Sequence, residues 1–256
     1  MAIKDEFDAS SSKPEPNELI EAVQIANEYL VKELLKKGAD VNARMPDAPE
    51  TGTALNCAAS YGHVEIVRAL IHKGARLEEK DGQENTPLIS AAQVPSLEIV
   101  QLLLEKGANP NAKNEDGNTA LILAGTNKDV VELLIKYGAD LDAKNNEGLT
   151  ALMTVATTYD GAEIARVLID NGADLDAKNE QGQTALDLAF ENEANTGIES
   201  TEISQLITEA REIRIRMAEE KARAEAAAEA ERLHTLATMK QQHLKAQAQK
   251  LKPRLG

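Results

Sequence analysis

Aromatic residues are almost absent from this chain: they make up 2% of its 256 residues, and none is a tryptophan. Large aromatic side chains usually dominate a thick globular core. We therefore expect Leu, Ile, Val and Ala to fill a thin core between small packed elements. No stretch approaches 18 uninterrupted apolar residues, so the sequence predicts no membrane span.

Cysteine is nearly absent as well, because Cys57 is the only one. A single cysteine excludes an intrachain disulfide and favours a reducing compartment, here the cytoplasm. Residues 1–16 hold Pro14, Pro16 and a run of three serines, and they lack the apolar stretch of a signal peptide. We expect this segment to be a disordered leader.

Basic residues are scarce in the first part of the chain. The net charge of the whole chain is −15. Residues 201–256 carry 11 Lys and Arg against 8 Asp and Glu, so residues 1–200 carry 17 against 35. A surface this acidic repels phosphate backbones, which argues against nucleic acid and favours a basic protein partner. The alternative is that the charge only keeps the protein in solution.

Two short patterns are present in abundance, and both recur at one interval. A Gly-Ala pair starts at residues 38, 74, 107, 138 and 172, in steps of 36, 33, 31 and 34 residues. A Thr-Ala-Leu or Thr-Pro-Leu triplet starts at residues 53, 86, 119, 150 and 184. A period near 33 with this triplet indicates stacked helix pairs joined by β-turns. On these patterns the chain resembles the ankyrin-repeat family over about residues 17–210.

The resemblance implies an all-α solenoid, and the composition of the tail adds a long C-terminal helix after it. Each Thr caps a first helix, each Gly ends a second helix, and the polar stretch after it forms a projecting finger. One such repeat cannot bury its apolar face alone, so the repeats must stack. We place about six repeats, including degenerate end repeats, in residues 17–200.

The tail differs from the repeats in composition. Residues 201–249 contain neither Pro nor Gly and are rich in Ala, Glu, Lys, Arg and Gln, which predicts one long helix continuing the last repeat. An apolar stripe from Ile203 to Met217 is expected to pack on that repeat. A second apolar set within residues 233–251 fits a partner, self-association or a frayed helix that docks on nothing. Residues 250–256 are expected to be a flexible basic end.

Motifs for catalysis are missing. The sequence has no phosphate-binding glycine loop, no H-E-x-x-H zinc motif and no G-x-S-x-G nucleophile motif. His234 and His243 lie nine residues apart, on opposite sides of one helix, so they cannot share a metal ion. His63 falls between two helices, where the family resemblance implies a structural role. We therefore predict no enzyme activity, no cofactor and no metal.

The resemblance implies that a partner is held by the fingers and by the exposed edge of the first helices. Tyr61, Val94, Leu149 and Met153 are the apolar candidates, although Leu149 and Met153 could instead support neighbouring fingers. One finger position is lysine in three repeats, at Lys113, Lys144 and Lys178. We expect these side chains to interact with the acidic fingers rather than with a ligand. The full set predicted to bind protein is Glu50, Tyr61, Gln83, Asn85, Val94, Glu115, Asp116, Asn118, Asn146, Glu147, Leu149, Met153, Glu180, Gln181 and Gln183.

These features predict a non-catalytic module that binds a protein partner through the concave finger face. The alternative is a self-associating scaffold that uses the C-terminal helix as a coiled coil. The repeats and the Ala/Glu/Lys-rich helix also look like those of ankyrin proteins of intracellular bacteria. Several of these are exported into host cells through a C-terminal signal, to which Glu219, Glu220 and the basic end are similar.

One modification site is also predicted. Leu34, Asp40, Val41 and Asn42 match the spacing around asparagines that a eukaryotic asparaginyl hydroxylase modifies in ankyrin repeats. The resemblance therefore implies Asn42 as the residue that such an enzyme would hydroxylate.

Overall fold

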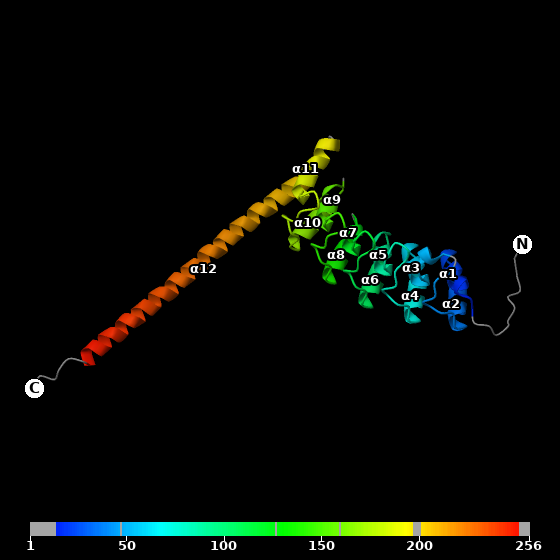
Figure 1. Cartoon of the computed structure of the whole chain (residues 1–256), viewed down its shortest axis with the longest axis horizontal. Coiled ribbons are helices and arrows are strands. Elements are labelled where there is room, and N and C mark those ends of the chain that lie inside the picture. The colour runs from blue at the N-terminus through cyan, green and yellow to red at the C-terminus, as the bar shows by residue number, and fades with distance from the viewer. Residues whose placement is uncertain (1–13, 47, 126, 159, 197–200, 251–256) are drawn as a thin grey trace, which may run out of the picture. The chain divides into compact units, whose positions relative to one another are not determined.

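The computed structural model describes residues 14–46, 48–125, 127–158, 160–196 and 201–250 (Figure 1). Within these residues the regular structure is helical, apart from an isolated bridge between Arg44 and Thr53. The chain divides into two compact units, Met1–Ile207 and Thr208–Gly256. We call the first the repeat unit and the second the C-terminal unit, and each is described by itself.

The repeat unit consists of short helices in pairs, which follow one another along the chain. A 3₁₀ turn, η1 (Pro49–Thr51), precedes the second pair. The helices are α1 (Pro16–Gln24), α2 (Glu28–Lys36), α3 (Ala54–Ser60), α4 (Val64–His72), α5 (Pro87–Ala92), α6 (Leu97–Glu105), α7 (Ala120–Leu123), α8 (Lys128–Lys136), α9 (Ala151–Ala156), α10 (Ala162–Asp170) and α11 (Ala185–Thr196), followed by α12 (Thr201–Lys250).

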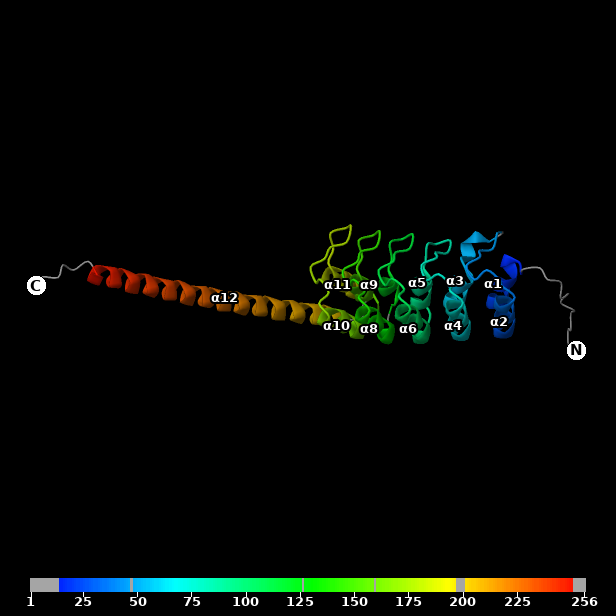
Figure 2. The same ribbon diagram turned by 90° about the horizontal axis from the view of Figure 1, so that it is seen from below.

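The helices form two layers. The first helices of the pairs contact one another in the order α1, α3, α5, α7, α9 and α11, and the second helices in the order α2, α4, α6, α8 and α10. Figure 2 shows the second layer along one edge of the repeat unit and the loops between repeats, the fingers, along the opposite edge. The fingers therefore form a row beside the first helices.

Threonine starts the first helices as the triplet predicted. In α7, for example, the Thr119 hydroxyl accepts a hydrogen bond from the Ile122 N–H at 3.4 Å, which satisfies one of the free donors of the first turn. Pro87 occupies the first turn of α5, where its missing N–H costs nothing. All five threonines accept such a bond from the backbone N–H three residues later: Thr53, Thr86, Thr119, Thr150 and Thr184.

The Gly-Ala pairs end the second helices in a uniform way. The Ala N–H of each pair donates to the carbonyl five residues earlier, as Ala108 does to Leu103 at 3.0 Å. This bond closes the helix end with a left-handed glycine. The same bond, at 3.0 Å, joins Ala39 to Leu34, Ala75 to Leu70, Ala139 to Leu134 and Ala173 to Leu168.

Aliphatic side chains fill the space between the layers, as the lack of aromatics predicted. Leu70, Leu103 and Leu134, one from each of three successive second helices, are fully buried. The last repeat is closed by the first turns of α12, where Ile203 and Ile207 are buried. Because each pair buries its apolar side chains against its neighbours, the stack forms one continuous core.

The fold class is confirmed: it is an all-α stack of helix pairs with a long C-terminal helix. In the part of the chain that the structure describes, no helix combines the length and apolarity that crossing a membrane requires. α1 already begins at Pro16, inside the predicted leader, and residues 1–13 and 251–256 lie outside the described residues. Ile213 and Met217, for which the stripe predicted packing, are more than half exposed.

The core can be tested with two leucines of α6. Leu103 is 0% exposed and Leu97 is 37% exposed. We expect Leu103→Ala to lower the free energy of unfolding by about 2–5 kcal/mol, because it leaves a cavity between two repeats. Leu97→Ala should cost less than ~1 kcal/mol. Urea unfolding followed by circular dichroism measures both, and equal losses would contradict the assigned core.

Candidate protein-binding surface

Four fingers are built on the same turn, which spans residues 81–85, 114–118, 145–149 and 179–183. In each, the first residue is Asp or Asn, and its side-chain oxygen accepts from the N–H groups two and four residues later. In the second of these fingers, Asn114 Oδ1 accepts from Asp116 at 3.1 Å and from Asn118 at 2.9 Å. The equivalent acceptors are Asp81, Asn145 and Asn179.

Neighbouring fingers are joined by backbone hydrogen bonds at their tips. The Glu115 N–H donates to the Gln83 carbonyl at 3.1 Å, and the Glu180 N–H donates to the Glu147 carbonyl at 3.0 Å. Between them, the Asn146 N–H donates to the Asp116 carbonyl at 2.8 Å. Each finger is thus held by the one before it, so the row is a preformed surface rather than a set of independent loops.

The repeated lysines contribute to the same row, but not as predicted. The Lys113 ammonium donates to the Lys144 carbonyl at 2.7 Å, and the Lys144 ammonium donates to the Lys178 carbonyl at 2.7 Å. For Lys113 and Lys144, the expectation of pairing with finger carboxylates is therefore wrong. Both charges are directed to backbone oxygens of the next finger.

Side-chain amides link some of the fingers, and Leu149 interrupts this link. Asn114 donates to Asn85 at 3.0 Å, and Asn145 donates to Asn118 at 3.0 Å. The next position in the series is Leu149, which has no amide to accept the bond. Asn179 donates instead to Gln183 of its own finger at 3.1 Å.

Most of the residues predicted to bind protein lie on the surface. Asn85 and Met153 do not: they are 5% and 1% exposed, so their predicted surface position is wrong. Asn85 packs inside the amide links, and Met153 lies in the core. Tyr61 is 58% exposed, and Glu50, Gln83, Glu115, Asp116, Asn146, Glu147, Glu180 and Gln181 are exposed, while Val94, Asn118, Leu149 and Gln183 are half-buried.

The exposed finger carboxylates give the row its charge. Glu115, Glu147 and Glu180 come from three successive fingers, and none of their side chains forms an ion pair with another described residue. On the second helices, by contrast, ion pairs join neighbouring repeats: Lys128 contacts Glu163 at 2.7 Å. These three finger carboxylates are therefore not compensated by an ion pair within the described residues.

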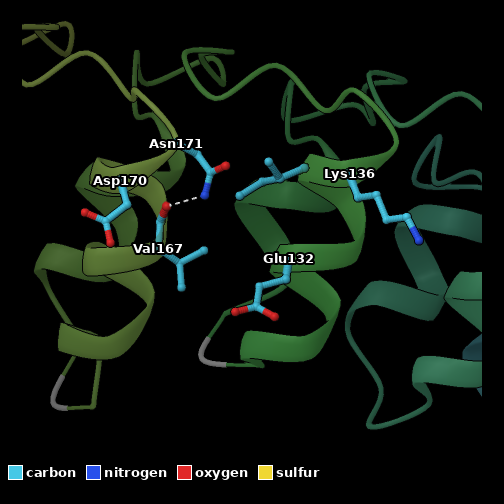
Figure 3. A pocket seen from close by; sticks show the side chains of 6 residues that line it. Glu132, Lys136, Val167, Asp170 and Asn171 are labelled. Atoms are coloured by element: carbon cyan, nitrogen blue, oxygen red, sulfur yellow. Dashed lines mark hydrogen bonds between the residues drawn. The ribbon is translucent and has the colours of Figure 1, made fainter.

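A shallow pocket of about 340 Å³ lies between α8 and α10, in the layer of second helices (Figure 3). Glu132 and Lys136 line it from α8, and Val167 and Asp170 from α10. The Asn171 amide donates to the Val167 carbonyl at 2.8 Å, drawn as the dashed line in Figure 3. The pocket is open, and its charged side chains, Glu132, Lys136 and Asp170, are exposed.

Within the described residues, the candidates for a metal site or a reactive nucleophile are the His, Cys, Asp and Glu side chains. No group of three or more His, Cys, Asp and Glu side chains is arranged there to hold a metal. Burial raises the pKa of the Cys57 thiol to about 11, so at neutral pH it stays a thiol and is a poor nucleophile. His63 lies at the N-cap position of α4 without a side-chain capping hydrogen bond, and its ring contacts the Tyr61 ring, with the ring centroids 5.8 Å apart.

Asn42, the predicted modification site, joins two repeats. Its side-chain oxygen accepts from the Arg76 N–H at 2.8 Å, and its own N–H donates to Asp40 at 3.0 Å. Asn111 and Asp142 accept equivalent bonds from Asp140 and Asp174. Hydroxylation of Asn42 stays a prediction, whereas its hydrogen bonds give it a structural role.

The chain belongs to the ankyrin-repeat family. The family model described as ankyrin repeats (3 copies) matches residues 19–114, 80–145, 96–179 and 124–215, which together span most of the chain. Ankyrin repeats are generally protein–protein interaction modules and are typically non-catalytic.

Solved structures support the assignment. The ankyrin repeat protein EF0377 is 31% identical, with a TM-score of 0.67, over 76% of this chain and 98% of that one. An ankyrin repeat domain from Acinetobacter baumannii is 27% identical, with a TM-score of 0.66, over 75% and 96% of the two chains. The ankyrin domain of Bcl-3, a member of the IκB family, is 28% identical, with a TM-score of 0.63, over 74% and 81%.

A curated human relative is similar over a short segment only. Ankyrin repeat and KH domain-containing protein 1 is 41% identical over 70 residues, which are 27% of this chain and 3% of the human protein. The neighbours therefore include bacterial and human proteins and do not establish the origin of this chain.

The packing of the fingers can be tested with two glycines. Gly148 and Gly182 have φ angles of 76° and 79°, but a Cβ on Gly148 would lie 2.8 Å from the Glu180 nitrogen, whereas one on Gly182 would meet nothing within 4 Å. Gly182→Ala should cost about 1–2 kcal/mol for the left-handed backbone alone. Gly148→Ala should cost more, because the next finger must also move. Urea unfolding measures the difference, and equal costs would show that the fingers are not in close contact.

Proposed function

We propose that this protein binds a basic protein partner through its row of fingers and acts without catalysis. The observation that carries the proposal is the presence of Glu115, Glu147 and Glu180 on three successive fingers, exposed and outside any ion pair with the described residues. Around them lie exposed amides at Gln83, Asn146 and Gln181. Of these, Asn146 already donates to the Glu115 carbonyl at 2.9 Å, and Gln83 accepts from Asn85 at 3.2 Å, so each keeps only part of its hydrogen-bonding capacity for a partner. Carboxylates and amides so placed can accept and donate hydrogen bonds to Lys and Arg side chains and to a peptide backbone.

The order of the fingers supports the same proposal. Bonds between the tips, and the two lysine bonds to backbone carbonyls, fix the spacing of the finger backbones that carry the carboxylates before any partner arrives. A preformed surface loses little conformational entropy on binding, so more of the interaction energy appears as affinity. The negative charge would also steer a basic partner toward the row.

The apolar centre of such an interface would be small. Tyr61, which is 58% exposed at the C-terminal end of α3, is the one aromatic residue of the predicted binding set, and tyrosine is enriched at the energetic centre of interfaces. Val94 and Leu149 are half-buried and would add area without a deep pocket. The proposal therefore relies mainly on polar recognition by the fingers.

The proposal is tested by reversing charge on the fingers. The triple variant Glu115→Lys, Glu147→Lys and Glu180→Lys should weaken the partner captured by the wild-type chain by roughly tenfold or more, because attraction becomes repulsion at three places. Affinity capture with mass spectrometry identifies the partner, and titration of that purified partner measures the change.

The matched control makes the same change of net charge on the second helices. It is the variant Glu105→Lys, Glu132→Lys and Asp170→Lys, whose exposed side chains lie away from the fingers. The control should retain wild-type affinity. A finger variant that binds as tightly as the wild type, or a control that loses as much, would refute the finger row as the binding surface.

A narrower form of the proposal makes the partner a protein of another cell, into which this chain is exported from a bacterial cytoplasm. The likeness to an Acinetobacter ankyrin domain supports it, as does the similarity of Glu219, Glu220 and the basic end to C-terminal export signals. A translocation reporter fused to the chain should then enter host cells and should stop doing so when residues 233–256 are deleted. If the reporter still enters host cells after residues 233–256 are deleted, the result contradicts a C-terminal signal.

A further inference from the structure

The C-terminal unit exposes large apolar side chains that the finger surface does not use. Leu233 and Leu236 lie on α12 with 58% and 62% of their surfaces exposed, and Met239 is exposed to 62%. In the turns before them, from Ala218 to Arg232, the apolar residues are all alanines. Exposed leucines one turn apart on a helix are the usual contact points of a second helix.

These leucines belong to a regular seven-residue pattern. One series, spaced by seven residues, consists of Ala226, Leu233 and Lys240. A second series with the same spacing consists of Glu229 and Leu236, each three residues after a member of the first. Positions spaced in this way form one stripe along an α-helix and are the core positions of a helix pair. In this helix the stripe reads Ala, Glu, Leu, Leu, Lys, so two leucines lie between one acidic and one basic residue.

The charges in the stripe discriminate between the two ways of pairing it with an identical helix. In a parallel pair, each core residue meets its own copy, so Glu229 meets Glu229 and Lys240 meets Lys240. Two like-charge contacts at core positions disfavour that arrangement. In an antiparallel pair centred between residues 234 and 235, Glu229 meets Lys240 of the second copy, and this contact forms twice.

The same antiparallel register brings the apolar residues together. Leu233 meets Leu236 of the second copy, and this contact also forms twice, between the two Glu–Lys contacts. On one flank, Ala230 lies beside Ala237 of the second copy, where small side chains allow the helices to approach closely. All of these residues are exposed in the structure.

We propose that α12 binds the α12 of a second copy of this chain in an antiparallel pair, centred between residues 234 and 235, in which Glu229 pairs with Lys240. The occupant is a second copy because the stripe is self-complementary in charge and in apolar shape only when its direction is reversed. This dimer surface is independent of the finger row, so each dimer presents two finger rows to its partners.

Charge exchange in the full chain tests the pairing. Glu229→Lys alone places Lys against Lys240, and Lys240→Glu alone places Glu against Glu229, so each should weaken dimerisation about tenfold or more. The double variant Glu229→Lys with Lys240→Glu restores opposite charges and should dimerise as the wild type does. Sedimentation equilibrium over a range of protein concentrations measures the association of each.

Two matched variants control for net charge. Glu231→Lys and Lys245→Glu make the same changes at positions outside the stripe, and both should leave dimerisation unchanged. A parallel pair would treat the double variant and the wild type alike, but it would not be weakened selectively by the two single variants at residues 229 and 240.

Disulfide trapping tests direction. Chains carrying Ala230→Cys and chains carrying Ala237→Cys should form mixed disulfides with each other in preference to disulfides with themselves. The wild-type chain, whose Cys57 is buried, should form none. Preferential trapping of each variant with itself would overturn the antiparallel direction. A wild-type chain that stays monomeric at all concentrations, or a dimer insensitive to the single charge changes, would overturn the proposal.

Discussion

Stacking of neighbours is the constraint on which the repeat unit depends. A helix pair with an aliphatic face and no aromatic side chains cannot enclose a core alone, and each pair buries its leucines only when another pair covers them. Leu70, Leu103 and Leu134 are fully buried because each lies between successive repeats. The same requirement explains why Ile203 and Ile207 of α12 are buried, since they cover the last helix pair in the place that another repeat would take. The stability of such a stack is therefore approximately the sum of the intrinsic stability of each repeat and of the contacts between neighbours.

The fingers also depend on their neighbours, through hydrogen bonds rather than through apolar contacts. Each tip is held by a backbone bond from the next finger, and Lys113 and Lys144 extend the link by donating to carbonyls one repeat away. Polar groups that satisfy one another within the row fix its geometry, while the carboxylates that take no part in the links stay available. The division between linking amides and free carboxylates is what makes the row a candidate for recognition rather than only a structural edge.

The sequence predicted the parts of the fold whose chemistry is local. Thr119 and Pro87 mark helix starts because a hydroxyl cap and a missing N–H act within one turn, and the Gly-Ala pairs mark helix ends for the same reason. The predicted surface was less accurate where the answer depends on the next repeat. Asn85 reads as a polar finger residue, yet Asn114 of the following finger covers it, and Met153 reads as an edge residue, yet it is fully buried. The lysine bonds could not be predicted, because their acceptors are backbone carbonyls, which every residue has.

One finger tolerates a side chain in a left-handed backbone conformation. Glu84 has a φ of 59°, at the finger position that is glycine in the three fingers that follow. A left-handed backbone costs a side chain about 1–2 kcal/mol, and an exposed ion pair, here Lys80 with Glu84 at 3.0 Å, offsets at most ~1 kcal/mol of this. The rest must come from the bonds of the same finger, in which Asp81 accepts from Gln83 and Asn85. The turn is thus set by its first residue and by its neighbours, and this finger accommodates a side chain at a position where a Cβ on Gly148 would lie 2.8 Å from the next finger. Differences of this kind between fingers are what would allow one scaffold to suit a particular partner.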